Sequence, residues 1–389
     1  MQRHQLALLT VYSLLCLQAA PMGAQTASDP FQRFQRFRRF RRFQPVDEAS
    51  QQLIGITDDM PTGQSRLKEL ADAAGVVPQP APPNGVEAVR NNHNGKPLRL
   101  ALTLAGGGAR GYAHIGVLKV PEEEGIKPDL IAASSTGALI GSLYCAGLSV
   151  KQIEYLARAG KMAKAFLPRS KYLQAMGYLL RYVGMRLLGL RPKIGLYSGK
   201  SIARFVERNV PNGVRTFKDL KIPLAVTSVN LIDTRQQWLT EGNIGQAVQA
   251  SCTLPFMYRP VTNDGKLLVD GATRETLPTE MAQASGAPVV VAVKLHSFLE
   301  KMPARKINMS TFAYADRVSE ILMSEIESKA VASADVLIEP RIDSQMREFD
   351  EVSASIAAGE EATRKVLPEI RRRLNIQAPQ SAEARGQNM

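Results

Sequence analysis

Cysteine, histidine and tryptophan are scarce in this chain of 389 residues, which contains three cysteines, four histidines and one tryptophan. Cys16 lies in an apolar stretch near the amino terminus, which leaves Cys145 and Cys252 for the rest of the chain. Two cysteines cannot form a four-ligand zinc site, and no histidine pair has the spacing of metal ligands on one helix. A disulfide between Cys145 and Cys252 would suit an oxidising compartment, but two buried thiols are the simpler expectation.

A long apolar run is also missing at the amino terminus. The apolar stretch at residues 6–17 is shorter than the roughly 20 residues that a membrane-spanning helix needs. It follows Arg3 and His4 and precedes small residues at 21–24, which is the pattern of a secretory signal peptide. We therefore expect residues 1–24 to be a signal peptide and the protein to be exported, either periplasmic or secreted. An uncleaved amino-terminal anchor is the alternative.

The charge balance is basic, with a formal net charge of +13 and an ordinary apolar fraction of 44%. Phenylalanine recurs every third residue across 31–43, with arginine between, and a period of three gives no single stripe on a helix. Such a segment suits an anionic membrane surface, with nucleic acid as a second candidate partner and a disordered linker as the third interpretation. We expect residues 25–97 to be this segment plus a linker, 98–375 to be the folded domain, and 376–389 to be a disordered tail.

Short apolar runs alternate with helical patterns from residue 98 onward. This alternation predicts an α/β fold with a largely parallel sheet. Strands are expected at 98–105, 130–132, 222–229, 237–240, 266–269, 289–293 and 335–340. Helices are expected at 112–120, 136–146, 149–160, 244–254, 280–285, 310–332 and 352–374, the last broken or kinked at Pro368. Residues 166–191 are apolar on nearly every side, which indicates a core helix pair or a lid that meets lipid.

A glycine cluster follows the first strand and contains Gly106, Gly107 and Gly108. Consecutive glycines can turn several N–H groups toward one point, where they stabilise a phosphate or a developing oxyanion. The spacing also fits a dinucleotide-binding fingerprint, but Asp129 precedes the second strand, whereas the ribose-binding acid should end it. Residues 195–201 resemble a phosphate-binding loop with one residue too few between the glycines.

The second turn places Ser135 between a short apolar run and a helical run, with small residues on both sides. This is the arrangement of a nucleophile elbow, although an isolated serine here would more often cap the helix. A serine nucleophile needs a base. Asp270 ends an apolar strand and is one candidate, and His296, which follows the last core strand, is the other.

Three motifs in the same order resemble the patatin-like phospholipase family, in the compact bacterial form related to the catalytic domain of neuropathy target esterase. The glycine cluster is similar to the family's oxyanion loop, Ser135 stands at the nucleophile position, and Asp270 begins a motif similar to that of the catalytic aspartate. The resemblance covers residues 98–374. The supporting motif residues are Ala109, Arg110, Gly111, Ala133, Gly137, Gly271 and Ala272.

This resemblance implies a three-layer α/β/α fold with a largely parallel central sheet and a nucleophile elbow. It implies a serine lipid acyl hydrolase, of the phospholipase A or lysophospholipase kind, with a Ser135–Asp270 dyad. Backbone N–H groups of Gly106, Gly107 and Gly108 would form the oxyanion hole. The expected substrate is a phospholipid or other fatty-acyl ester, and no metal or other cofactor is required.

Two of the departures from the family pattern matter most for activity, and a third is the stretch at 274–276, which replaces a more asparagine-rich one. Ala133 stands where the family has glycine, so a methyl group enters the crowded elbow. Pro121 falls inside the helix expected after the glycine cluster, where proline removes a hydrogen bond. A catalytically impaired lipid-binding or membrane-binding protein with the same fold is therefore the alternative interpretation.

Overall fold

The computed structural model describes residues 97–166, 197–255, 257–296, 311–342 and 351–376, with short stretches at 85–87, 89, 195, 299 and 301. All of them belong to one compact unit, Pro78–Met389. The expected signal peptide, the Phe/Arg segment at 31–43 and nearly all of the regions 166–191 and 376–389 lie outside the described residues. The domain boundaries and the membrane contacts assigned to those segments stay predictions.

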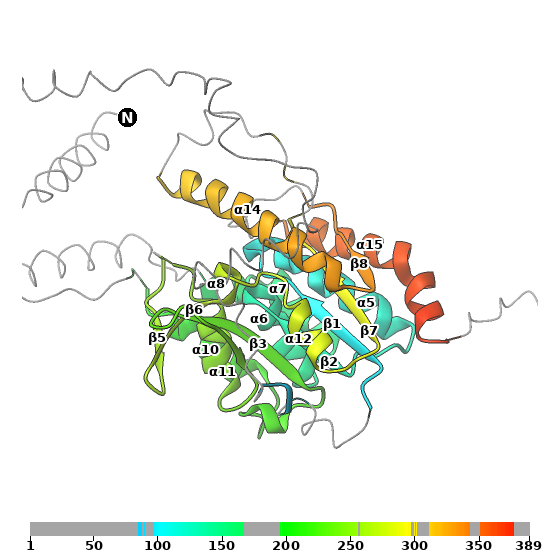
Figure 1. Cartoon of the computed structure of the whole chain (residues 1–389), viewed down its shortest axis with the longest axis horizontal. Coiled ribbons are helices and arrows are strands. Elements are labelled where there is room, and N and C mark those ends of the chain that lie inside the picture. The colour runs from blue at the N-terminus through cyan, green and yellow to red at the C-terminus, as the bar shows by residue number, and fades with distance from the viewer. Residues whose placement is uncertain are drawn as a thin grey trace, which may run out of the picture. The chain divides into compact units, whose positions relative to one another are not determined.

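One sheet of eight strands organises the described part of the chain. The strands are β1 (Leu100–Leu104), β2 (Leu130–Ala133), β3 (Leu224–Asn230), β4 (Gln236–Leu239), β5 (Val261–Asn263), β6 (Lys266–Asp270), β7 (Val289–Val293) and β8 (Val336–Ile338). Their order is β5-β6-β3-β2-β1-β7-β8, and β4 pairs with β3. Strands β3, β2, β1, β7 and β8 are mutually parallel, whereas β4, β5 and β6 join through antiparallel pairs (Figure 1).

Helices cover both faces of the sheet. The longer elements are α5 (Ala113–Glu123), α6 (Ser135–Cys145), α7 (Val150–Arg158), α8 (Lys161–Phe166), α10 (Lys200–Asn209), α11 (Ile244–Ser251), α12 (Thr279–Ala284), α14 (Thr311–Ala330) and α15 (Val352–Arg373). Short 3-10 turns are η2 (Gly108–Tyr112), η3 (Phe217–Asp219), η4 (Gly271–Thr273) and η5 (Val331–Ser333).

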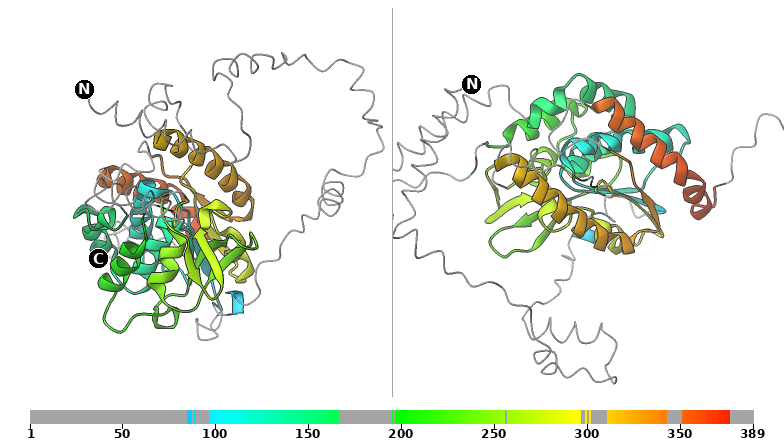
Figure 2. Two further views of the ribbon diagram at one scale, coloured as in Figure 1. Left: turned by 90° about the vertical axis from the view of Figure 1, so that its left-hand side faces the viewer. Right: turned by 90° about the horizontal axis from the view of Figure 1, so that it is seen from above.

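The pleat of the strands decides which face each side chain joins. Leu102 and Leu104 of β1 belong to the large core under α5, α6, α11 and α15, whereas Ala101 joins a smaller core with Met281 of α12. Val89, upstream of β1, is also buried in the smaller core. The carboxyl end of α14 meets the amino end of α12, where Thr279 Oγ1 donates to the carbonyl of Ala330. Figure 2 shows α14 and α15 on different sides of the strands.

The expected α/β fold with a largely parallel sheet is confirmed. Of the two expectations for Pro368, a break or a kink, the break is wrong. Helix α15 continues from Val352 to Arg373 through this proline. Pro368 is exposed, so the carbonyl of Arg364, which would receive its missing N–H, can be solvated by water instead. In α5, Pro121 lies in the last turn, and its carbonyl accepts the N–H of Ile126 at 2.8 Å, which shapes the exit from the helix.

Strands β2 and β6 share one edge of β3, and this arrangement positions the candidate site. Val226 of β3 pairs with Ala133 of β2, and two residues further along Ser228 pairs with Asp270 of β6. Both Val226 and Ser228 use their other edge for β4, so β2 and β6 must lie end to end on the same side. Because β2 is parallel and β6 antiparallel to β3, their carboxyl ends meet. The residues that follow β2 and end β6 are thereby brought together.

Candidate active site

Ser135 occupies a sharp turn between β2 and α6. Its φ is 49°, in the left-handed region that a serine adopts only under constraint, while Ser134 before it is extended. Gly137 allows the turn to be this tight, because a Cβ there would lie 2.4 Å from the carbonyl oxygen of Leu104. The sequence therefore folds into the predicted nucleophile elbow, with Ser135 at its bend.

The side chains of Ser135 and Asp270 meet inside the protein. Ser135 Oγ donates to Asp270 Oδ2 at 2.8 Å, and the two residues are 8% and 2% exposed. The other carboxylate oxygen, Oδ1, accepts the backbone N–H of Ala272 at 2.9 Å. Burial raises the pKa of Asp270 to about 7, and the hydrogen bonds from Ala272 and Ser135 limit that rise. An aspartate with this pKa can exchange a proton near neutral pH.

Three consecutive residues at the end of α11 hold the backbones of both Ser135 and Asp270. The N–H of Ser135 donates to Ser251 Oγ at 2.8 Å, and the thiol of Cys252 donates to the carbonyl of Ser135 at 3.1 Å. The N–H of Asp270 donates to the carbonyl of Thr253 at 3.0 Å. The sequence analysis did not identify Ser251, Cys252 and Thr253 as residues that hold the site. The signal available was a run of small polar residues closing the helix before Pro255.

The glycine cluster after β1 lies directly over this pair. A Cβ on Gly106 would be 3.1 Å from the Cβ of Ser135, so only glycine lets the loop approach so closely. The N–H of Gly106 donates to the carbonyl of Thr276 at 3.0 Å, which differs from the prediction that all three glycines offer N–H groups to an oxyanion. Among the described residues, the N–H groups of Gly107 and Gly108 have no such partner.

The remaining motif residues support this loop. Ala109 and Gly111 are buried in η2, and Gly271 leaves no room for a side chain, because a Cβ there would lie 2.1 Å from Thr227 Oγ1. The Arg110 guanidinium is buried and donates from Nη2 to Glu320 Oε1 of α14 at 3.0 Å. Each position has a structural reason for its residue type.

Two histidines near the candidate site, His114 and His296, are both buried. Nε2 of His114 donates to the carbonyl of Ala105, just before the glycine cluster, at 2.8 Å. Burial lowers the pKa of His114 to about 4, so it is neutral at pH 7. His296 is bonded through Nδ1 to Glu327 Oε1 at 2.7 Å, rather than to Ser135 or Asp270. The structure therefore pairs Ser135 with the aspartate and not with a histidine.

Ala133 is accommodated despite its methyl group. It is fully buried in β2, and Gly141 of α6 faces this part of the strand. An ideal Cβ on Gly141 would be 3.7 Å from the Cβ of Ala133 and 3.2 Å from Cγ2 of Ile131. The separation from Ala133 is an ordinary van der Waals contact, so the methyl group fits without a clash and the elbow forms with Ala133 in place.

Other interpretations from the sequence lose support. Asp129 accepts the N–H groups of Arg99 and Leu100 at the amino end of β1, the end opposite the glycine cluster, which does not fit a ribose-binding acid. Cys145 and Cys252 are free, buried thiols, as expected. Within the described residues, no group of three or more His, Cys, Asp or Glu side chains is placed to hold a metal ion.

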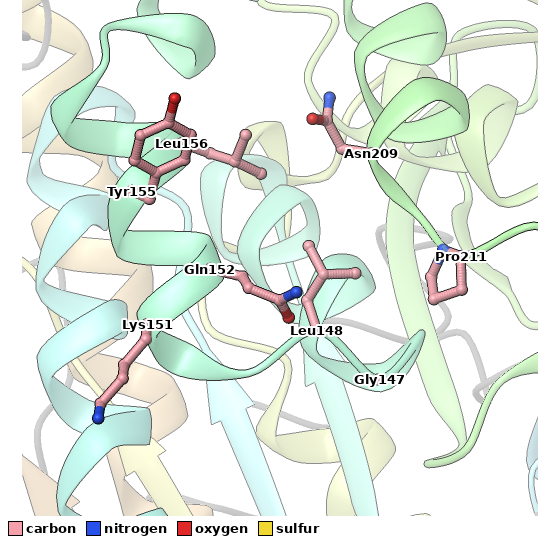
Figure 3. Close-up of a pocket in the computed structure, with 8 residues that line it drawn as sticks. All are labelled: Gly147, Leu148, Lys151, Gln152, Tyr155, Leu156, Asn209 and Pro211. Carbon is pink, nitrogen blue, oxygen red and sulfur yellow. The ribbon is translucent and has the colours of Figure 1, made fainter.

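A surface cleft of about 600 Å³ lies between α7 and the end of α10. Figure 3 shows Lys151, Gln152 and Tyr155 along one side, with Asn209 and Pro211 on the other. None of the residues that line it belongs to the Ser135–Asp270 site.

Of the helices that the structure describes, none is both long and apolar enough to cross a bilayer.

A strained serine at a strand–helix turn of a parallel sheet is the arrangement of a nucleophile elbow. In this protein a buried carboxylate, and not a histidine, lies at the serine hydroxyl. Residues 102–282 match the family model described as patatin-like phospholipase, so this part of the chain carries that family's domain. This confirms the resemblance seen in the three motifs.

The chain is also similar to parts of two longer proteins. Lysophospholipase NTE1 of Mycosarcoma maydis is 29% identical over 222 residues, which is 57% of this chain and 10% of the relative. Patatin-like phospholipase domain-containing protein 6 of Homo sapiens is 28% identical over 247 residues, which is 59% of this chain and 16% of the relative. The chain thus aligns with only a small part of these much longer proteins.

Two solved structures were also found to be similar. The crystal structure of VipD from Legionella pneumophila has a TM-score of 0.37 and 15% identity, covering 70% of this chain and 67% of that chain. The type III effector ExoU has a TM-score of 0.35 and 16% identity, covering 72% and 54%.

Proposed function

We propose that this protein is a serine lipid acyl hydrolase in which Ser135 is the nucleophile and Asp270 the general base. The observation that carries the proposal is the 2.8 Å hydrogen bond from Ser135 Oγ to Asp270 Oδ2 at the bend of the elbow. A general base works best when its pKa lies near the working pH, and burial raises the pKa of Asp270 to about 7. No histidine is needed in this scheme.

The reaction would proceed through an acyl-enzyme. Asp270 Oδ2 accepts the proton of Ser135 Oγ while Oγ bonds to the carbonyl carbon of the fatty-acyl ester. The tetrahedral intermediate then collapses, and Asp270 gives its proton to the departing alcohol oxygen of the lipid. Water attacks the acyl-enzyme, Asp270 accepts a proton from that water, and the proton returns to Ser135 Oγ as the free fatty acid leaves.

Gly107 and Gly108 are the proposed donors to the oxyanion of both tetrahedral intermediates. Their N–H groups are not used by other backbone groups of the described residues, whereas that of Gly106 is bonded to Thr276. Gly108 has a φ of 58°, which turns the chain into η2 and favours glycine. Helix α6 also begins at Ser135, so the positive end of its dipole lies at the reacting atom.

The proposed substrates are phospholipids or lysophospholipids. Support comes from the family match and from relatives that are named lysophospholipases. Export to the periplasm or medium, and contact with a membrane through residues 31–43 and 166–191, complete the proposal. Their support is the sequence pattern alone, and fractionation of cells expressing the full chain would test them.

The decisive experiment compares purified wild type with Ser135→Ala and Asp270→Asn on a p-nitrophenyl butyrate substrate and on phosphatidylcholine vesicles. Each substitution should lower kcat by about 1,000-fold or more, because nucleophile and base act as a unit. Ser134→Ala is the matched control, since its buried hydroxyl has no hydrogen-bond partner within the described part of the chain. It should keep most of the activity.

Other outcomes would redirect the account. Activity that survives both Ser135→Ala and Asp270→Asn would refute the dyad. A folded wild type that binds vesicles but hydrolyses neither substrate would favour the lipid-binding alternative.

A further inference from the structure

His296 and Glu327 form a buried pair that the proposed mechanism does not use. His296 follows β7, at the carboxyl end of the parallel strands, and Glu327 lies on α14. Both side chains are fully buried, at 0% exposure. Burying an acid and a histidine is costly unless they are well bonded to each other, so the pair requires a reason.

Three hydrogen bonds fasten residue 296 to α14. Nδ1 of the His296 ring lies 2.7 Å from Glu327 Oε1, and the backbone N–H of His296 donates to Glu327 Oε2 at 2.9 Å. Ser324 Oγ donates to the carbonyl of His296 at 2.9 Å. Because Glu327 uses both of its oxygens on one residue, the position and tilt of the imidazole are fixed.

The edge of that imidazole faces the proposed oxyanion loop. An ideal Cβ on Gly107 would lie 3.4 Å from His296 Cε1 and 2.8 Å from Leu295 Cδ1, so these side chains form the wall behind Gly107. His296 Nε2 is buried and makes no hydrogen bond to any residue that the structure describes. The ring therefore contributes shape and contact at Gly107.

A second buried contact joins the same helix to the same loop. Glu320 lies seven residues, about two helical turns, before Glu327 on the inner side of α14 and accepts from Arg110 Nη2 at 3.0 Å. Between the two glutamates, Met323 packs against Ala272, whose N–H holds Asp270. Helix α14 thus contacts the loop at Arg110 and the aspartate turn at Ala272, and it reaches Gly107 through His296.

We propose that His296, held by Glu327, is a positioning residue that sets the backbone of Gly107 for the oxyanion. The proposal rests on the proposed function. Hydrogen-bond donors stabilise an oxyanion only when they are fixed about 3 Å from it, so a small shift of Gly107 weakens transition-state binding without weakening substrate binding. The pair should therefore affect kcat and not KM.

The test compares Glu327→Leu, which removes the acceptor, with Glu327→Gln, which keeps an oxygen at the same reach. Glu325→Leu is the matched control on the same helix, because the Glu325 side chain is 71% exposed and forms an exposed ion pair with Lys329. We measure kcat and KM on p-nitrophenyl butyrate, the melting temperature, and the inhibition constant of a trifluoromethyl ketone. Such a ketone forms a tetrahedral oxyanion adduct with the serine.

Glu327→Leu should lower kcat by about 10- to 100-fold, less than the loss of a whole oxyanion donor, with KM nearly unchanged. Affinity for the ketone should fall by the same factor, because the analogue needs the same donors. Glu327→Gln should retain most of the wild-type kcat and of the affinity for the ketone. Glu325→Leu should match wild type in both quantities. A purely structural pair would lower the melting temperature without this parallel change.

His296→Phe provides the second variant if Glu327→Leu does not fold, because it keeps a flat ring but cannot bond to Glu327. Wild-type kcat and ketone affinity in a folded variant of either kind would overturn the proposal. If His296→Phe lowers kcat as much as Ser135→Ala does, the proposal is also overturned, in favour of His296 as the base. If wild type itself is inactive, the proposed function fails instead.

Discussion

Ser251→Ala tests whether the strained turn at Ser135 is held by α11. The substitution removes the Oγ that accepts the N–H of Ser135 at 2.8 Å, in a residue with 0% exposure. A buried N–H left without a partner costs about 1–3 kcal/mol of folding stability. Since Cys252 still donates to the carbonyl of Ser135, we expect the elbow to loosen rather than unfold.

The effect on catalysis can be estimated from the same geometry. A non-glycine residue in the left-handed region is strained by about 1–2 kcal/mol. Without Ser251, Ser135 can relax from φ 49°, and each turnover must restore the turn. At about 1.4 kcal/mol per factor of ten, kcat should fall about 5- to 30-fold.

Urea unfolding and kcat on p-nitrophenyl butyrate measure the two effects. Ser142→Ala is the control, because Ser142 is equally buried in α6 but its Oγ donates to the carbonyl of Leu139, away from Ser135. A Ser251→Ala variant that matches Ser142→Ala in kcat would refute the idea that α11 holds the turn.

Two further predictions concern pH. Burial raises the pKa of Asp270 to about 7, and the carboxylate is the active form. We therefore expect kcat/KM on a soluble ester to fall tenfold per pH unit below about pH 7. A fall in kcat/KM that begins only near pH 4 would contradict this. Glu275 has a buried carboxyl that accepts from Trp238 Nε1, and burial raises its pKa from 4.5 to about 8. The folded state therefore binds this proton up to a higher pH than the unfolded state does. The resulting contribution of Glu275 to the free energy of unfolding is complete below pH 4.5 and is lost as pH rises toward 8. Relative to Glu275→Gln, wild type should lose about 1.4 kcal/mol of unfolding free energy per pH unit across that window. The control Glu241→Gln changes an exposed site and should show the same pH dependence as wild type. Parallel plots of unfolding free energy against pH for Glu275→Gln and wild type would contradict the reasoning.

The central strands could be predicted from the sequence because their signals are local. Residues of β1, β2 and β7 form short apolar runs next to glycine or small residues, as expected for strands buried on both faces. The serine turn and the glycine cluster were visible for the same reason. Strand β5 has three residues, none of them buried, and gave no such signal.

Contacts between distant residues could not be predicted from the sequence. The meeting of β2 and β6 depends on a register across β3 that no local pattern encodes. The same holds for Ser251 at the backbone of Ser135 and for Glu327 at His296, which are 116 and 31 residues apart. Helix α15 is not broken at Pro368, and the sequence could not show that this residue would face solvent while α15 packs along α5 at Gly116 and Gly359.

One measurement tests most directly the claim that Ser135 is a nucleophile activated by Asp270. Wild type, Ser135→Ala and Asp270→Asn are treated with a fluorophosphonate, and the adduct is mapped by peptide mass spectrometry. We predict one adduct on Ser135 in wild type, none in Ser135→Ala, and labelling at least about 100-fold slower in Asp270→Asn. An adduct on another residue, or labelling of Ser135 at the wild-type rate in Asp270→Asn, would contradict the account.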